Sequence, residues 1–223
     1  MNILIVSATK LEIEPLLLPF QYKKEINKNL KNYSYLNHSV DVLICGIGMT
    51  ATAFWMGKTL DSKKYDFSIN LGIAGSFDAH LKIGETVHVI ADEISELGAE
   101  DGDQFLSLTE LGLIQNHPKI SNTNPIKNTI LSSLKQVNGI TVNTVHGANH
   151  SIEKVKKRFN PQVESMEGAA FLMACLSEKI ECVQIRTISN LVEKRNKDNW
   201  NIPLAINNLC ETALKLIKNL SSM

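Results

Sequence analysis

The sequence predicts an α/β fold, a single-domain three-layer α/β/α sandwich around a mixed, mainly parallel sheet. The main observation is that short apolar runs alternate with segments of helical periodicity along the whole chain. A second is length, because 223 residues suffice for one substantial α/β domain and are short for two, so residues 1–223 should form a single domain. A third is that several apolar runs end in glycines or polar residues, where such sheets bind ligands.

Seven segments have the composition of strands, since each is a short apolar or alternating run that ends in glycine, polar residues or charge. The last of them is apolar from Val183 to Ile188 except for Arg186, and it finishes on Ser189 and Asn190. The predicted strands cover residues 2–8, 40–48, 67–75, 85–95, 139–145, 163–167 and 180–189.

Helices are predicted where apolar residues recur at a spacing of three or four. Pro15 and Pro19 shorten the first helical segment, whereas Pro203 suits the first turn of the last one. The longest irregular stretch, residues 96–125, is predicted to be a loop with one short helix. The helical segments are 11–20, 50–60, 126–137, 151–159, 168–178 and 203–220.

The composition excludes several classes of protein. Lys and Arg together number 23, as do Asp and Glu, so the net charge is zero and the basic surplus of a nucleic-acid binder is missing. No apolar run approaches the ~18 residues of a membrane helix, and the N-terminus lacks the features of a signal peptide. The four cysteines stand in apolar segments without a C-x-x-C pair, as reduced core cysteines do. We therefore expect a cytoplasmic protein that binds neither nucleic acid nor membrane.

Two glycine turns follow predicted strands, "CGIGMTA" at residues 45–51 and "LGIAGSF" at residues 71–77. The first fits the G-x-G-x-x-A dinucleotide fingerprint, but it does not follow the first strand, and its acidic candidates Asp61 and Asp66 precede the next strand. A nicotinamide site is therefore the weaker interpretation. Glycines let backbone N–H groups approach a ligand, although tight turns without a ligand explain both segments equally well.

Carboxylates and histidines supply the other candidates. Glu12 lies just beyond the first strand, where it could hold a water as a general base or only stabilise a helix start. Glu167 could cap its helix or bind substrate hydroxyls, since buried carboxylates need hydrogen bonds. His146 and His150 are four apart, but Gly147 replaces the glutamate of the H-E-x-x-H zinc motif, so we expect no metal and a polar loop at the mouth of a cleft.

These segments together resemble a known family. The opening strand followed by Glu12, then "GIG", "NLGIAGSF" with "LKIGE", "VESMEGAA" and "IRTISN", occur in this order in the purine nucleoside phosphorylase and nucleosidase superfamily. The chain resembles most closely its futalosine hydrolases, in the segments "SATKLEIEPLL", "ELGAEDGDQFLSLTELGL" and "IRTISNLVEKRNKDNWNIPLAI". The resemblance implies a cytoplasmic nucleosidase without cofactor or metal, which binds a small nucleoside and forms a homodimer or larger homo-oligomer.

The resemblance also implies roles for individual residues. Glu12 would activate the attacking water, Glu167 would bind the ribose hydroxyls, and Asn190 would contact the imidazole side of the purine. Arg186 stands where the family has an arginine near the carboxylates. The remaining substrate-binding positions are Ile47, Gly48, Ile73, Ala74, Gly75, Asn149, His150 and Met166.

Asn190 decides between two substrates within this family. The methylthioadenosine/adenosylhomocysteine nucleosidases have aspartate there, and a carboxyl group suits the N6 amino group and N7 of adenine. An amide can instead donate to O6 and accept from a protonated N7, which matches hypoxanthine. The expected reaction is thus hydrolysis of futalosine to hypoxanthine and dehypoxanthine futalosine in the alternative menaquinone pathway; an adenine-releasing nucleosidase is the main alternative. A phosphorylase, a catalytically silent nucleoside-binding protein and a helix-capping role for Asn190 are weaker alternatives.

Overall fold

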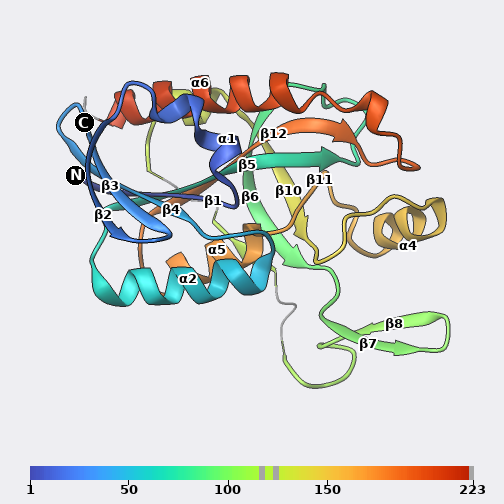
Figure 1. Ribbon diagram of the computed structural model, residues 1–223. Coiled ribbons are helices and arrows are strands. Elements are labelled where there is room, and N and C mark those ends of the chain that lie inside the picture. Colours follow the sequence, from blue (N-terminus) through green and yellow to red (C-terminus); the bar gives the residue numbers. More distant parts are fainter. Residues whose placement is uncertain (116–118, 123–125, 221–223) are drawn as a thin grey trace.

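The protein has three layers, with helices packed on both faces of a mixed sheet (Figure 1). The computed structural model describes residues 1–115, 119–122 and 126–220. One face is covered by the long C-terminal helix α6 (Ile202–Leu220) with α1 (Lys10–Ile13) and α3 (Thr129–Ser133), and the other by α2 (Met49–Ser62) and α5 (Gly168–Ser177). The remaining helical elements are α4 (Asn149–Phe159), η1 (Pro15–Leu17) and η2 (Lys197–Asn199).

The main sheet has the strand order β11-β10-β6-β12-β5-β1-β4-β3-β2, with β9 added beside β6. Its pairings along β10–β6, β12–β5, β5–β1 and β1–β4 are parallel, whereas β12–β6, β4–β3, β3–β2 and β6–β9 are antiparallel. The strands are β1 (Asn2–Ser7), β2 (Gln21–Asn27), β3 (Leu30–Tyr35), β4 (His38–Ile44), β5 (Phe67–Ser76), β6 (Thr86–Ile94), β9 (Ile120–Ser121), β10 (Lys135–Thr141), β11 (Val163–Ser165) and β12 (Cys182–Leu191).

One half of this sheet closes on itself. Short strand β11 pairs in parallel with β10 and also antiparallel with β5, so β5, β12, β6, β10 and β11 form a ring. Closure removes the free edge that an open sheet would leave at β11. It also brings the ends of β5, β11 and β12, which are distant in sequence, to one place.

The core lies in both interfaces between sheet and helices. Strands β1, β5 and β12 present apolar residues alternately to the two faces, as the period of two requires. Toward α6, Ile5, Ile69 and Ile185 pack against Leu209 and Leu216, all fully buried. Toward α2 and α5 the core is formed by Leu4, Val6, Leu43, Met56, Phe171, Leu172 and neighbours. All four cysteines are buried free thiols.

The structure corrects the predicted elements in four places. Residues 126–137 were expected to be one helix, but α3 ends at Ser133 and β10 begins at Lys135, because Val137 is buried by pairing with Val89 of β6. Burial in a sheet overrides local helical periodicity. Strand β12 extends past the predicted end at residue 189 to Leu191, and hairpin β2–β3 was not predicted because its first strand is mostly exposed and lacks an apolar pattern.

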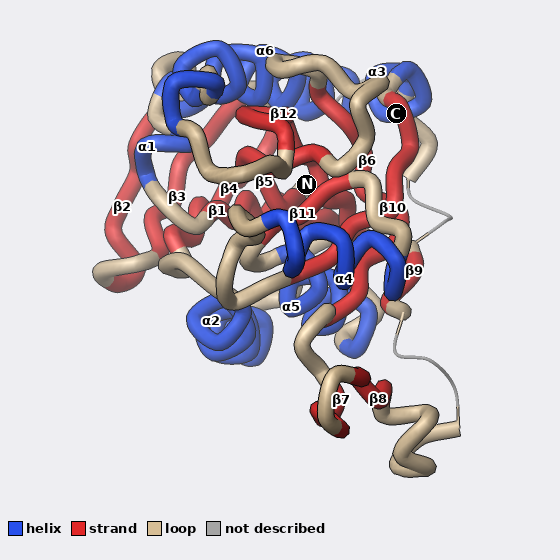
Figure 2. Tube along the Cα trace, turned by 90° about the vertical axis from the view of Figure 1, so that its right-hand side faces the viewer, coloured by secondary structure: helices blue, strands red, loops and turns tan. Residues whose placement is uncertain are grey.

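The fourth correction concerns residues 96–125, expected to be a loop with one short helix. This segment contains a small two-stranded sheet, β7 (Gly98–Asp101) with β8 (Gln104–Ser107), which projects from the body of the protein (Figure 2). Arg158 of α4 holds the hairpin by stacking on the Phe105 ring, with 3.7 Å between Cζ and the ring centroid. Parts of the predicted loop, residues 116–118 and 123–125, lie outside the described residues.

In the described part of the chain, no helix combines the length and the apolar character that crossing a membrane requires.

Candidate active site

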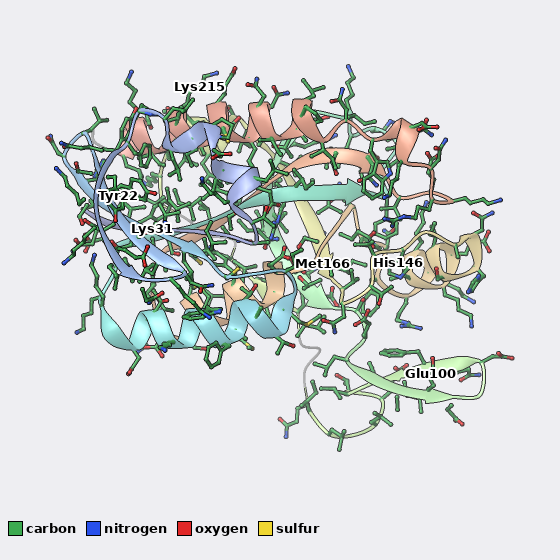
Figure 3. The ribbon with its side chains drawn as sticks, viewed as in Figure 1. Tyr22, Lys31, Glu100, His146, Met166 and Lys215 are labelled. Atoms are coloured by element: carbon green, nitrogen blue, oxygen red, sulfur yellow. The ribbon has the colours of Figure 1, made fainter. Side chains whose placement is uncertain are left out.

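A cavity of about 390 Å³ opens where β1, β5, β11 and β12 end, as expected for the carboxyl ends of strands in an α/β sheet. Met166 and His146, both labelled in Figure 3, lie on its wall. Three carboxylates and one carboxamide reach it. The lining residues are Ala8, Thr9, Leu11, Glu12, Ile47, Ile73, Ala74, Gly75, Val145, His146, Glu164, Ser165, Met166, Glu167, Ser189, Asn190, Arg195, Trp200, Ile202 and Ile206.

Glu12 is held by donors at the turn between β1 and α1. Its Oε2 atom accepts from the backbone N–H of Thr9 (3.0 Å) and the Thr9 hydroxyl (2.9 Å), as a glutamate at the third position of a capped helix does. The Ser7 hydroxyl lies 3.3 Å from the same oxygen. The other oxygen, Oε1, has one long contact, with the N–H of Ile73 at 3.3 Å. Oε1 is therefore the atom with capacity to accept a further hydrogen bond.

Glu167 is the second carboxylate, located where β11 passes into α5. Its Oε1 accepts from the N–H of Gly48 (3.1 Å), and its Oε2 lies 3.6 Å from Nη1 of Arg186. Burial raises the pKa of the Glu167 carboxyl above its usual value, and the Arg186 charge opposes this shift. Gly48 has φ 93°, a conformation that favours glycine, so the second glycine of the "GIG" turn positions an internal carboxylate.

Arg186 lies beneath the two acids and is only 1% exposed. Its Nη2 donates to Oδ1 of Asn70 on β5, and the amide of Asn70 is itself held by the carbonyl of Val6 at 3.1 Å. Gly72 leaves the space for the guanidinium, since a Cβ atom there would overlap Nη1. A buried cation is tolerated only with such partners, so Asn70, Gly72 and Glu167 form one unit with Arg186.

Asn190 reaches the cavity because β12 carries a bulge. Ile188 pairs with Ala74 and Asn190 with Gly75, so Ser189 is an extra residue with no partner in the β12–β5 ladder. Bulges of this kind redirect side chains beside active sites. The Ser189 hydroxyl donates to Oδ1 of Asn190 (2.8 Å), and Nδ2 of Asn190 donates to the carbonyl of Leu191 (2.8 Å). The carbonyl of Leu191 only accepts, so its contact identifies Nδ2 of the amide. The single hydroxyl hydrogen of Ser189 can be donated either to Oδ1 of Asn190 or to the carbonyl of Ala74, which is 3.2 Å away.

A buried network under the start of α5 supports Glu167. The carboxylate of Asp92 accepts from the Thr141 hydroxyl (2.9 Å) and from Nε2 of Gln184 (3.0 Å), and the same Thr141 oxygen accepts from the N–H of Ala169 (2.8 Å). A Cβ atom on Gly168 would overlap both Asp92 and Gln184. Burial raises the pKa of Asp92 to about 6, opposed by these hydrogen bonds and by Arg186.

A family model described as the phosphorylase superfamily matches residues 2–220, almost the whole chain. The chain belongs to the phosphorylase superfamily.

Its relatives in the superfamily include two kinds of enzyme. A futalosine hydrolase from Acidothermus cellulolyticus is 30% identical over 77% of this chain and 72% of its own length. A 5'-methylthioadenosine/S-adenosylhomocysteine nucleosidase from Colwellia psychrerythraea is 29% identical over 70% of this chain and 69% of its own length. A crystal structure of a nucleosidase of this second kind, also from Colwellia psychrerythraea and in complex with adenine, covers 99% of this chain and 96% of its own with a TM-score of 0.80 at 22% identity. That structural similarity shows a shared fold.

Most residues that sequence reasoning selected in this superfamily member come together. Glu12, Glu167 and Asn190 line the cavity, as do the substrate-binding candidates Ile47, Ile73, Ala74, Gly75 and Met166. Gly48 and Arg186 lie behind the cavity wall and contact Glu167.

Asn149 and His150 do not line this cavity. Asn149 begins α4, and His150 faces a neighbouring cavity of about 490 Å³ between α4 and the β7–β8 hairpin. The preceding loop residues Val145 and His146 occupy the position expected for them.

Among the cavity residues that were not predicted from the sequence are Thr9, Glu164, Arg195 and Trp200, and His146 was expected only in a polar loop at the mouth of a cleft. The ring of Trp200 stacks under the Arg195 guanidinium with 5.1 Å between Cζ and the ring centroid. Two of these positions carried a visible signal, since His146 belongs to the loop expected at the mouth of a cleft and Glu164 to the segment "VESMEGAA". Among the described residues, no cluster of three or more His, Cys, Asp or Glu side chains is arranged to hold a metal ion.

Asp92 gives a pH-dependent prediction. A folded-state pKa of about 6, raised from 3.8, means that the ionised carboxylate is disfavoured in the folded protein. The favourable contribution of the protonated form is complete below pH 3.8 and is lost as the pH rises through 6. From pH 4 to pH 7, the free energy of unfolding of the wild type should therefore fall by up to about 3 kcal/mol relative to Asp92→Asn. Urea unfolding at several pH values measures this difference, and a constant difference would contradict it.

Proposed function

We propose that the protein hydrolyses the N-glycosidic bond of a 6-oxopurine nucleoside, and that its substrate is futalosine, which yields hypoxanthine and dehypoxanthine futalosine. This reaction belongs to the alternative menaquinone pathway. The observation that carries the proposal is the oriented carboxamide of Asn190 in a cavity that also contains Glu12 and Glu167.

The amide of Asn190 matches a 6-oxopurine atom by atom. Oδ1 accepts one hydrogen bond from Ser189 and keeps a second acceptor site, which suits a protonated N7. Nδ2 uses one hydrogen on the carbonyl of Leu191 and keeps the other, which suits O6. Protonated N7 is the form in which the base departs, because the base gains electron density as the bond breaks. The amide thus stabilises the leaving group of a 6-oxopurine nucleoside.

Glu12 is the residue we assign to the nucleophile. Because Oε2 is occupied by Thr9 and Ser7, the carboxylate is fixed in orientation and Oε1 is left to accept from a water. The water attacks C1′ on the face opposite the base and loses its proton to Glu12.

Glu167 is assigned to the sugar. Its carboxylate accepts hydrogen bonds from the ribose hydroxyls and lies where positive charge develops as the ring becomes oxocarbenium-like. Arg186 and the Gly48 N–H hold it in place from behind the cavity wall. This arrangement supplies electrostatic stabilisation without movement of the carboxylate during the reaction.

The second candidate is an adenine-releasing nucleosidase, acting on methylthioadenosine, adenosylhomocysteine or aminofutalosine. The division of the relatives between futalosine hydrolases and methylthioadenosine/adenosylhomocysteine nucleosidases favours keeping it. The two candidates differ at the base, since adenine has a donor at position 6 and hypoxanthine an acceptor.

Purified protein incubated with futalosine and with aminofutalosine in phosphate-free buffer separates these candidates, with the released base identified by chromatography. We expect hypoxanthine from futalosine at the higher kcat/KM. Release only in the presence of phosphate would point to a phosphorylase, and faster release of adenine would favour the second candidate.

Asn190→Asp should change this preference. A carboxylate would face O6 with a second acceptor, whereas it suits the amino group of adenine, and an unmatched buried polar group costs about 1–3 kcal/mol. The ratio of kcat/KM for futalosine over aminofutalosine should fall by at least roughly tenfold. An unchanged ratio would show that residue 190 does not contact the base.

Glu12→Gln should lower kcat by on the order of a hundredfold or more, because the amide cannot accept the proton of the water. Glu14→Gln is the matched control, since Glu14 is two residues away, outside the cavity and 56% exposed in a surface pair with Lys10. Thermal unfolding of both variants verifies that they fold. Turnover near that of the wild type in Glu12→Gln would refute the assigned role.

We also propose that the protein forms a homodimer through α2 and α5. These helices pack side by side on the lower face in Figure 1, and they expose Phe54 (62%) and Met173 (47%). Both helices cover the same face of the sheet, and large exposed apolar residues on them are typical of an interface. Sedimentation velocity should show a dimer for the wild type and a shift toward monomer for Phe54→Glu. A monomeric wild type would contradict the proposal.

A further inference from the structure

The assigned roles leave one buried pair in the cavity without a task, His146 and Glu164. Nδ1 of His146 lies 2.7 Å from Oε2 of Glu164, and the backbone N–H of His146 donates to Oε1 of the same carboxylate at 3.1 Å. The two side chains are 15% and 3% exposed. The His146 ring also makes a T-shaped contact with Phe77, with 6.0 Å between ring centroids. The imidazole is therefore held in one orientation.

This pair lies beside the carboxamide assigned to the base. Glu164 of β11 pairs with Gly75 of β5, and Gly75 pairs with Asn190 of β12, so the three residues are neighbours across the ring of strands. A Cβ atom on Gly75 would lie 3.4 Å from Nδ2 of Asn190 and 3.5 Å from Cγ of Glu164. Both side chains thus extend past the same glycine into the cavity, and His146 lines the cavity next to them.

The carboxylate determines which ring nitrogen of His146 carries hydrogen. An ionised carboxylate only accepts, so Nδ1 must donate to Glu164, and in the neutral imidazole Nε2 then has a free lone pair. No hydrogen-bond partner of Nε2 is found in the described part of the chain. His146 lines this cavity and also the neighbouring one beside α4, so its ring is an oriented acceptor at the boundary between the two.

We propose that His146 is a second base-binding residue, positioned by Glu164, whose Nε2 accepts a hydrogen bond from N1–H of a 6-oxopurine. This inference rests on the proposed function and extends it. Hypoxanthine carries hydrogen on N1, whereas N1 of adenine is an acceptor and would face the Nε2 lone pair. Asn190 and His146 together would then select N7, O6 and N1 of the 6-oxopurine and disfavour adenine at two positions.

The test compares inosine with 1-methylinosine, in which a methyl group replaces the hydrogen on N1. Both substrates are assayed with the wild type, His146→Phe, Glu164→Gln and a control, His80→Phe. Phenylalanine preserves the ring and the contact with Phe77 but offers no acceptor, and any clash with the methyl group stays similar. His80 is an exposed histidine that is not among the lining residues.

The expected result is a change in a ratio. The value of kcat/KM for inosine over 1-methylinosine should fall by roughly tenfold in His146→Phe, because only inosine loses a hydrogen bond. The loss should appear mainly as a higher KM for inosine, since the bond forms in the substrate complex as well as in the transition state. Glu164→Gln should lower the same ratio, and His80→Phe should not. The ratio is unaffected by partial unfolding, since both substrates meet the same active fraction.

Two other outcomes distinguish a failure of the inference from a failure of the proposed function. If the wild type hydrolyses inosine and His146→Phe keeps the wild-type ratio, His146 does not contact N1, while the proposed function stands. If the wild type does not hydrolyse inosine, release of hypoxanthine from futalosine decides the proposed function by itself, and calorimetric titration with hypoxanthine and 1-methylhypoxanthine tests His146 alone. A preference for hypoxanthine that disappears in His146→Phe would support the inference, and any other titration result would refute it.

Discussion

The buried guanidinium of Arg186 is the constraint on which the candidate site depends. Its side chain is 1% exposed in the middle of β12, and an isolated charge there would be strongly destabilising. Three features on other elements accommodate this charge: the side-chain oxygen Oδ1 of Asn70, the absence of a side chain at Gly72 and the carboxylate of Glu167. Because Glu167 is the N-cap residue of α5, the same interaction also fixes where that helix meets the sheet.

Backbone N–H groups around the cavity donate hydrogen bonds to its carboxylates. The N–H of Gly48 donates to Glu167 and the N–H of Ile73 to Glu12, so the glycine turns that resemble nucleotide-binding loops are engaged with internal acids. This explains in physical terms why a G-x-G pattern after a strand is weak evidence for a dinucleotide. Both acids line the cavity and are held by these backbone donors.

Much of the fold was predictable because buried positions place apolar residues in the sequence at the period of a strand or a helix. The long strands β1, β5 and β12 and the helices α2, α4, α5 and α6 all appear near the expected residues. The errors lie where that signal is weak or misleading: exposed β2, the short hairpin β7–β8, and the segment in which β10 replaces a predicted helix. In the last case a strand neighbour distant in sequence decided the structure.

The sequence by itself determined which chemical groups are present: Glu12, Glu167 and Asn190 at the ends of strands, and an arginine in a run that is otherwise apolar. It also determined the family resemblance, because ordered motifs survive in the primary structure. Only the tertiary structure decided how these groups meet. Closure of the ring by β11, the bulge at Ser189 and the pairing of His146 with Glu164 join residues far apart in the chain, and such contacts leave no local periodicity to detect.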